Sequence, residues 1–159
     1  APPAHYWFLC SVCRCSFETS IASQTLTKTM SYPVFQKDYV KIFADTDSKL
    51  VNVTWNGTCS SEEYRASMEH ALEYAQAYDL DGWISNTKRG YAVDPSDSEW
   101  VSKEFIPKAL SQIKRVAIVV ADDVFRKLEV ESLENRLKAT VQHVAYFDSE
   151  EEAQKWIAQ

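Results

Sequence analysis

Glycine is scarce in this sequence, since only three of its 159 residues are glycine. Loops that cradle phosphate groups depend on closely spaced glycines, and neither the G-x-G-x-x-G pattern nor the lysine-containing phosphate-loop pattern occurs. The G-x-S-x-G elbow of hydrolases and the H-E-x-x-H pattern of zinc proteases are also absent. The sequence therefore offers no recognised catalytic motif, and we expect no catalytic residue and no cofactor.

Long apolar runs and an excess of positive charge are missing as well. No apolar run approaches the roughly 20 residues that a membrane-spanning helix needs, so we expect no transmembrane segment. The net charge of −6 repels phosphate groups, which argues against a nucleic-acid partner. Apolar residues make up 45% of the chain and aromatic residues 13%, which is enough for one globular domain, and we expect it to be cytoplasmic.

The first 29 residues differ from the rest of the chain. They hold three of the four cysteines and carry a net charge of +1, which leaves −7 for residues 30–159. We expect Met30 to lie close to a natural start and residues 1–29 to be an extension outside the domain formed by 30–159. A secretory signal is the alternative, but no basic segment precedes the short apolar run near the beginning.

Two groups of residues raise the question of a metal site. The run Cys10-x-x-Cys13-x-Cys15 provides three thiols, but Cys59 lies far away and has no Cys or His beside it. Acidic residues also gather near the expected ends of two parallel strands, where they could hold Mg²⁺ for phosphoryl-transfer or hydrolytic chemistry: Asp94, Asp97, Glu99, Asp122 and Asp123. Acids at helix starts are explained equally well by the helix dipole, and we expect no metal.

Periodicity and turn residues predict the elements of one α/β domain. Apolar runs and alternation predict strands over 39–44, 50–55, 82–85, 116–120 and 142–147. Helical spacing predicts helices over 60–78, 96–112, 122–138 and 149–158. Three of these helices begin with a Ser-x-x-Glu capping box, at Ser60, Ser96 and Ser149, and Pro107 predicts a kink or a break in the second.

The order of these elements, β-β-α-β-α-β-α-β-α, predicts a single mixed sheet with helices packed on it. The first two strands are separated by a short turn and form an antiparallel hairpin. The strands near Trp83 and Ile118 are apolar on both faces and are joined by a helix, which is typical of a parallel crossover unit. Residues that follow parallel strands form the usual binding edge of such a sheet.

Several motifs within residues 39–159 resemble the STAS-like family, which has the fold of the sporulation anti-sigma-factor antagonists. The motifs are Val53-Thr54-Trp55-x-Gly57, Ser61-Glu62-Glu63-Tyr64-Arg65, Gly82-Trp83-Ile84, Pro95-x-Asp97-x-Glu99-Trp100, Phe105-Ile106-Pro107-Lys108-Ala109-Leu110, Arg115-Val116-Ala117 and Tyr146-Phe147-Asp148 through Trp156. The resemblance implies a domain that works by docking to a protein, in some relatives switched by serine phosphorylation. The same fold also resembles lipid-carrier domains.

The polar stretch after the third expected strand is the first candidate site. In the switch-type relatives an Asp-Ser pair follows the central strand, whereas this chain has Asn and Thr there. We expect a loop over 86–90 in which two cations and a hydroxyl could bind an anion or a partner. The candidate binding or switch residues are Ser85, Asn86, Thr87, Lys88, Arg89 and Tyr91.

Large aromatic side chains form the second candidate site. They are most simply explained as core, but they could instead line an apolar pocket with residues 122–138 as a lid: Trp83, Trp100, Phe105 and Phe125. The sequence thus leaves three hypotheses open. They are a non-enzymatic docking module with a protein partner, a carrier of a lipid or other small apolar ligand, and a metal-dependent enzyme. A homodimer is a further open question.

Overall fold

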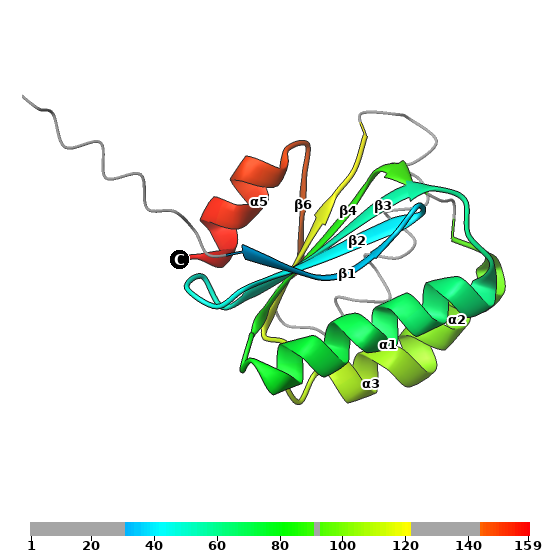
Figure 1. Ribbon diagram of the computed structural model, residues 1–159, viewed down its shortest axis with the longest axis horizontal. Coiled ribbons are helices and arrows are strands. Elements are labelled where there is room, and N and C mark those ends of the chain that lie inside the picture. Colours follow the sequence, from blue (N-terminus) through cyan, green and yellow to red (C-terminus); the bar gives the residue numbers. More distant parts are fainter. Residues whose placement is uncertain (1–30, 91–92, 122–143) are drawn as a thin grey trace, which may run out of the picture.

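The computed structural model describes residues 31–90, 93–121 and 144–159. These residues form a six-stranded sheet in which the strand order follows the sequence, β1-β2-β3-β4-β5-β6 (Figure 1). The strands are β1 (Ser31–Lys37), β2 (Val40–Asp45), β3 (Leu50–Gly57), β4 (Gly82–Gly90), β5 (Arg115–Val119) and β6 (Val144–Phe147). The helical elements are α1 (Ser61–Ala77), α2 (Pro95–Trp100), the π-helical segment η1 (Val101–Phe105), α3 (Ile106–Ala109) and α5 (Glu150–Ile157).

The sheet is mixed, which confirms the predicted fold class. β1, β2 and β3 pair antiparallel, whereas β3, β4, β5 and β6 pair parallel. Trp83 of β4 lies opposite Val116 of β5, and Ser85 lies opposite Ile118. The two inner strands are therefore neighbours that run in the same direction, so their carboxyl ends share one edge of the sheet.

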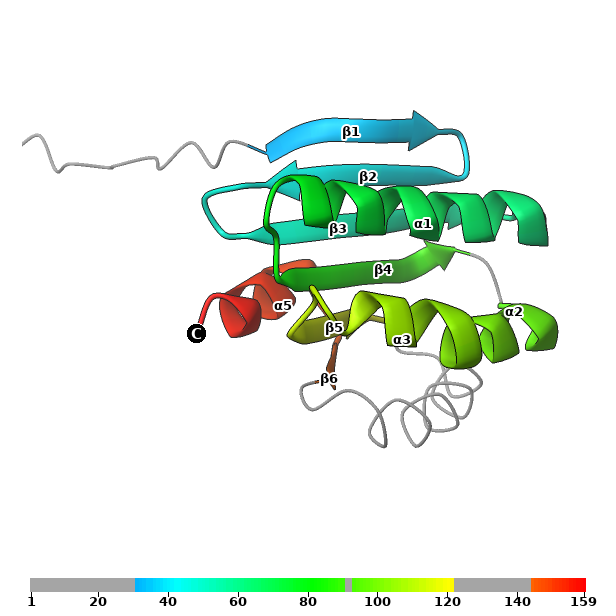
Figure 2. The same ribbon diagram turned by 90° about the horizontal axis from the view of Figure 1, so that it is seen from below.

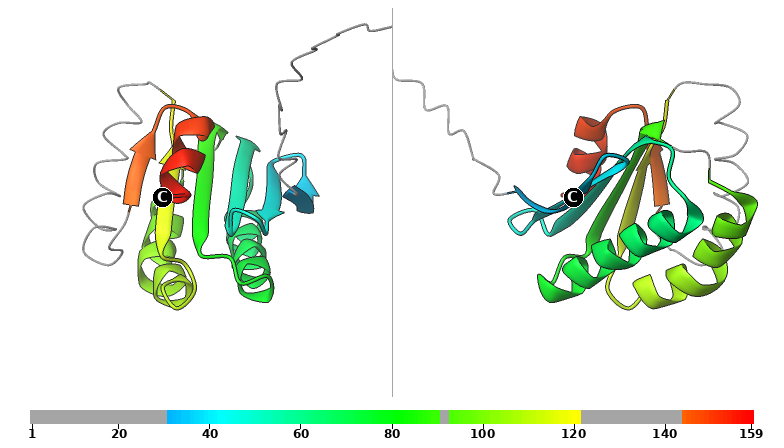
Figure 3. Two further views of the ribbon diagram at one scale, coloured as in Figure 1. Left: turned by 90° about the vertical axis from the view of Figure 1, so that its left-hand side faces the viewer. Right: turned by 45° about the vertical axis from the view of Figure 1, so that its right-hand side comes forward.

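Helices cover both faces of the sheet. α1 and the continuous helical stretch from α2 to α3 lie side by side on one face, and α5 lies on the opposite face (Figures 2 and 3). The larger hydrophobic core lies beneath α1 and η1 and includes Trp55, Trp83 and Phe105. The smaller core lies beneath α5 and includes Ile84 and Ile157.

The capping box at Ser60 forms as the sequence predicts. The Ser60 hydroxyl accepts a hydrogen bond from the Glu63 amide, and the Glu63 carboxylate accepts one from the Ser60 amide. These contacts satisfy two amides that would otherwise lack partners at the start of α1. At the start of α5 the Ser149 hydroxyl likewise accepts from the Glu152 amide. Both helix starts are fixed by local sequence.

The strand β1 was not predicted. It pairs with β2 along the edge of the sheet, but its register shifts between Pro33 and Phe35. This irregularity breaks the alternation of buried and exposed residues that identifies a strand in a sequence. Pro33 is tolerated because an edge strand need not donate from every amide.

The start of the second helix was predicted wrongly. The N-cap is Asp94, whose side chain accepts from the Ser96 amide, and Pro95 occupies the first turn. Ser96 is therefore inside the helix and is not its cap.

Near Pro107 the chain stays helical but widens into η1, where the Ile106 amide donates to the Val101 carbonyl five residues earlier. Proline lacks the amide that a regular α-helix needs at this position, and the π-turn accommodates the change.

The predicted helix over 122–138 and the first two residues of the predicted strand over 142–147 lie outside the described residues. The rest of that strand is β6. No helix in the described ranges is long and apolar enough to cross a membrane.

Candidate functional site

The predicted polar loop after β4 is part of β4 itself. The strand continues to Gly90, and its last residues pair with the end of β3, where Asn56 lies opposite Arg89. The prediction of a loop over 86–90 was therefore wrong. The strand β5 ends at Val119, which lies opposite Asn86. The tip of β4 therefore extends beyond β5, and polar residues are tolerated there.

The strand sends its candidate binding residues to different places. Ser85 faces the pocket described below, whereas the Asn86 amide group donates to Glu150 of α5 on the opposite face, at 2.9 Å. The Thr87 hydroxyl donates to the Val119 carbonyl at 3.1 Å and so closes the end of the β4–β5 pair. Tyr91 lies outside the described residues.

Lys88 and Arg89 are the most exposed of the candidates that the structure describes. Both are exposed at the tip of β4, and neither side chain makes an ion pair within residues 31–90, 93–121 and 144–159. Two adjacent cations therefore remain available on a chain whose net charge is −6. Such a pair favours contact with an acidic surface.

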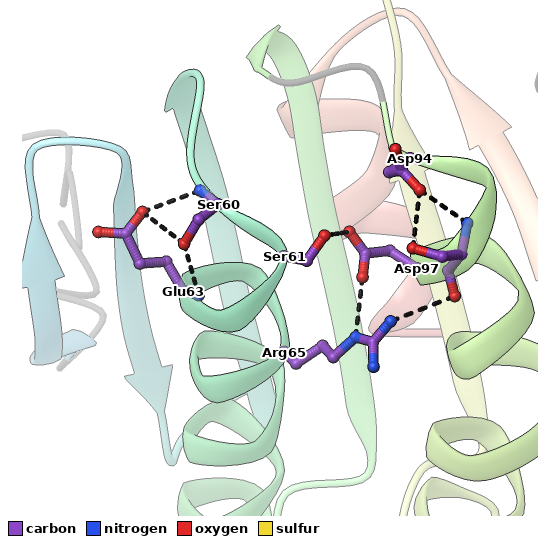
Figure 4. A network of polar contacts seen from close by, with 7 residues as sticks. Ser60, Ser61, Glu63, Arg65, Asp94 and Asp97 are labelled. Atoms are coloured by element: carbon purple, nitrogen blue, oxygen red, sulfur yellow. Dashed lines mark hydrogen bonds and ion pairs between the residues drawn. The ribbon is translucent and has the colours of Figure 1, made fainter.

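Beside the tip of β4, the starts of α1 and α2 are joined by a buried carboxylate (Figure 4). Asp97 of α2 is fully buried. It accepts a hydrogen bond from the Ser61 hydroxyl at 2.7 Å and one from the Arg65 Nε at 2.8 Å. The Arg65 guanidinium also lies 5.4 Å from the Trp100 ring centroid. The ion pair and the cation–π contact hold α2 against α1.

Asp97 was predicted either as one of several possible Mg²⁺ ligands or as an acid that complements a helix dipole, and its burial against α1 was not predicted. The sequence did contain a signal for its burial, because Asp97, Trp100 and Val101 are spaced so that they share one face of a helix, and all three are buried. The partner Arg65 lies 32 residues away and could not be identified from local pattern.

Two further titratable groups near this edge have shifted pKa values. Hydrogen bonds from the Ser96 hydroxyl and amide lower the pKa of Asp94, which stabilises its role as an ionised cap. Burial raises the pKa of the Cys59 thiol, and the carboxylates of Glu63 and Asp97 raise it further. Cys59 is therefore a poor candidate for an activated nucleophile, since a reactive cysteine needs a lowered pKa.

The acidic residues proposed as a metal site do not gather in the described part of the chain. There, no group of three or more His, Cys, Asp or Glu side chains is placed to hold a metal ion. Asp97 is directed to Arg65 and Ser61, and Asp94 caps α2. Asp122 and Asp123 lie outside the described residues.

A pocket of about 100 Å³ lies between the helices and the sheet on the face covered by α1 and η1. Most of its lining residues are apolar, and none is charged: Tyr64, Met68, Trp83, Ser85, Val101, Phe105, Ile106, Ala109, Leu110, Ile113, Val116 and Ile118. Trp83 and Phe105 meet edge to face at 5.6 Å between ring centroids. Trp100 packs on Phe105 but does not line the pocket, and Phe125 lies outside the described residues.

A polar contact on the opposite face was not predicted. Glu150, the first residue of α5, accepts hydrogen bonds from the amide groups of Asn52 in β3 and Asn86 in β4. These bonds fix the start of α5 over the middle of the sheet. Only the start of α5 could be predicted from local sequence, because Asn52 and Asn86 lie 98 and 64 residues from Glu150.

The fold and this edge define an α/β domain with a mixed sheet, in which two helix starts meet beside the carboxyl ends of parallel strands. A family model described as SpoIIAA-like matches residues 50–158, which is more than half of the chain. The chain therefore belongs to the SpoIIAA-like family, and the STAS-like resemblance is confirmed. Searches among curated proteins and among solved structures gave no match.

Proposed function

We propose that this chain is a non-enzymatic docking domain that binds an acidic surface of a protein partner through Lys88 and Arg89. Membership of the SpoIIAA-like family supports a docking role. The single observation that carries the proposal is the exposed, unpaired state of these two cations within the described part of the chain.

Lys88 and Arg89 are distinguished by being adjacent. Four other exposed lysines in the described part of the chain lie beside an acid, namely Lys49 with Asp79, Lys103 with Glu99, Lys108 with Glu69 and Lys114 with Asp81, and the exposed Lys37 and Lys155 have no cation next to them in the sequence. Those pairs neutralise their own surface. Lys88 and Arg89 instead stand at the tip of a strand that is held on both sides, by pairing with β3 and by the Thr87 hydroxyl. A fixed backbone lowers the entropy lost when the side chains engage a partner.

Charge reversal tests this proposal. Tagged wild-type chain is used to capture proteins from a lysate of the source organism, and the captured proteins are identified by mass spectrometry. The double variant Lys88→Glu/Arg89→Glu should lower recovery of the specific partner about tenfold or more, because attraction becomes repulsion. The control is Lys155→Glu, which reverses an exposed charge in the last turn of α5 and should leave recovery of the partner unchanged. Equal recovery with both variants would contradict the proposal.

We also propose that the chain is cytoplasmic and that it can form a homodimer. A second copy of the chain is itself a partner to be tested, because the acidic remainder of the surface could receive Lys88 and Arg89. Sedimentation equilibrium of wild-type chain and of the double variant distinguishes the two cases. A dimer that dissociates in the variant would identify the partner as the chain itself.

One observation favours a second candidate function, binding of a small apolar ligand. It is the pocket between the helices and the sheet, whose lining carries no charge. Apolar pockets with few polar groups are the usual form of small-molecule sites. In the described part of the chain no observation favours the metal-dependent enzyme.

A further inference from the structure

We infer that the pocket beneath η1 binds a small, uncharged ring compound that carries one hydrogen-bonding group, and that the Ser85 hydroxyl receives this group. The inference rests on the second candidate function above and gives its ligand a chemical class. It is independent of the surface formed by Lys88 and Arg89, which lies at the tip of β4.

The size of the pocket sets the first limit on the ligand. Its volume is about 100 Å³. An engineered apolar cavity of about 150 Å³ in another protein holds benzene, so this pocket suits a single ring that leaves part of its edge toward the opening. A long acyl chain is too large to be enclosed. The ligand is therefore smaller than the lipids expected of a lipid carrier.

The lining sets the second limit. Trp83 and Phe105, whose rings meet edge to face, both line the pocket, and Met68 adds a polarisable thioether. A ring can make offset or edge-to-face contacts with such walls. A charged ligand would lose its hydration without gaining an ion pair, because no lining residue is charged.

Ser85 gives the pocket its direction. Ser85 lines the pocket from β4, and its hydroxyl makes no hydrogen bond within residues 31–90, 93–121 and 144–159. On the neighbouring position of the same strand, the Thr87 hydroxyl is already bound to the Val119 carbonyl. A ligand hydroxyl or carbonyl group would supply the partner that Ser85 lacks.

The helical wall provides an independent sign of a site. Val101, Phe105 and Ile106 all line the pocket, and they belong to or directly follow the π-helical segment η1. Single π-turns within helices occur frequently at functional sites. Here the wide turn determines how Phe105 and Ile106 are presented to the pocket.

The test is a titration of the full ¹⁵N-labelled chain with phenol and with benzene, followed by NMR. We expect both compounds to shift the resonances of pocket residues in a saturable manner, and phenol to bind more tightly. Ser85→Ala should weaken phenol binding about two- to tenfold, the range of one hydrogen bond, and leave benzene binding unchanged. Ser111→Ala, an exposed change outside the pocket, is the control.

Two further measurements separate failure of this inference from failure of the candidate function. Ala109→Leu narrows the pocket and should abolish binding of both compounds, provided that its far-UV circular dichroism matches wild type. Dodecanoate should not compete with phenol. If phenol binds no more tightly than benzene in wild type, and Ser85→Ala changes the affinity for neither compound, an apolar site exists but the inferred ligand class is wrong. The same conclusion follows if dodecanoate displaces both compounds. If neither compound shifts a pocket resonance, the candidate function is wrong too.

Discussion

A single carboxylate, that of Asp97, connects the two helices that flank the tip of β4. It is fully buried, and both of its oxygens accept hydrogen bonds from α1, one from Ser61 and one from Arg65. Arg65 keeps 38% of its side chain exposed, so water still reaches part of the guanidinium. The ion pair is thus half solvated, and its contribution lies between that of a surface pair and that of a buried one.

Replacing this carboxylate tests its role. Asp97→Ala should lower the free energy of unfolding by about 2 kcal/mol, because Arg65 and Ser61 lose their acceptor but Arg65 can turn to solvent. Urea denaturation measures the change. Asp148→Ala removes an exposed acid near the start of α5 and should stay within about 0.5 kcal/mol of wild type. If the urea midpoint of Asp97→Ala equals that of Asp148→Ala, the ion pair between Arg65 and Asp97 adds nothing to stability.

At the scale of elements, the starts of helices are where local sequence is most informative and also where it can mislead. Two Ser-x-x-Glu patterns, at Ser60 and Ser149, provide caps, but the third, at Ser96, does not. Asp94 takes that place because Pro95 suits the first turn of a helix, so the cap lies two residues before Ser96. Two overlapping start signals competed, and the proline decided between them.

A pair of alanine variants distinguishes the two possible caps of α2. Asp94→Ala should lower the free energy of unfolding by about 1 kcal/mol, since the Ser96 amide and hydroxyl lose their acceptor. Ser96→Ala should cost less than about 0.5 kcal/mol, because the amide still reaches Asp94. Thermal or urea unfolding of both variants provides the comparison. The reverse order of stability would mean that Ser96 is the cap after all.

The sheet was predictable from the sequence wherever a strand is flanked by others and hard to predict at its margins. Val51 and Val53 alternate with polar residues because one face of β3 enters the larger core. β1 lacks that pattern because of its register shift, and the tip of β4 carries Lys88 and Arg89 because β5 no longer covers it. The candidate site was only partly predictable, since contacts such as Arg65 with Asp97 depend on tertiary packing.

At the scale of the whole molecule, one sheet serves two cores. Val51 and Trp83 enter the larger core, whereas Leu50 and Ile84, their neighbours in sequence, enter the smaller one. The strands therefore couple the two faces, and neither core can separate from the sheet without disturbing the other. We expect the domain to unfold in a single cooperative step.

A change in the smaller core should be detected in the larger one. Ile157→Ala should lower the free energy of unfolding by about 2 kcal/mol, because it removes a buried side chain from the smaller core. This value is near the lower end for isoleucine-to-alanine changes in a core, since Ile157 is the last residue of α5 and its surroundings can relax. Tryptophan fluorescence and far-UV circular dichroism should give the same lowered urea midpoint. Gln159→Ala is the exposed control. Two separate transitions in the variant would show that the cores unfold independently.

The strand order has a consequence for how the chain reaches this structure. Each strand of the described sheet lies beside the strand that precedes it in the sequence. Loop closure between consecutive strands carries a smaller entropic cost than pairing of distant segments, so the sheet can grow outward from the hairpin of β2 and β3 in the order of synthesis. Among the described elements, α5 follows the edge strand β6 and returns to contact β3 and β4 through Glu150, so we expect it to join last.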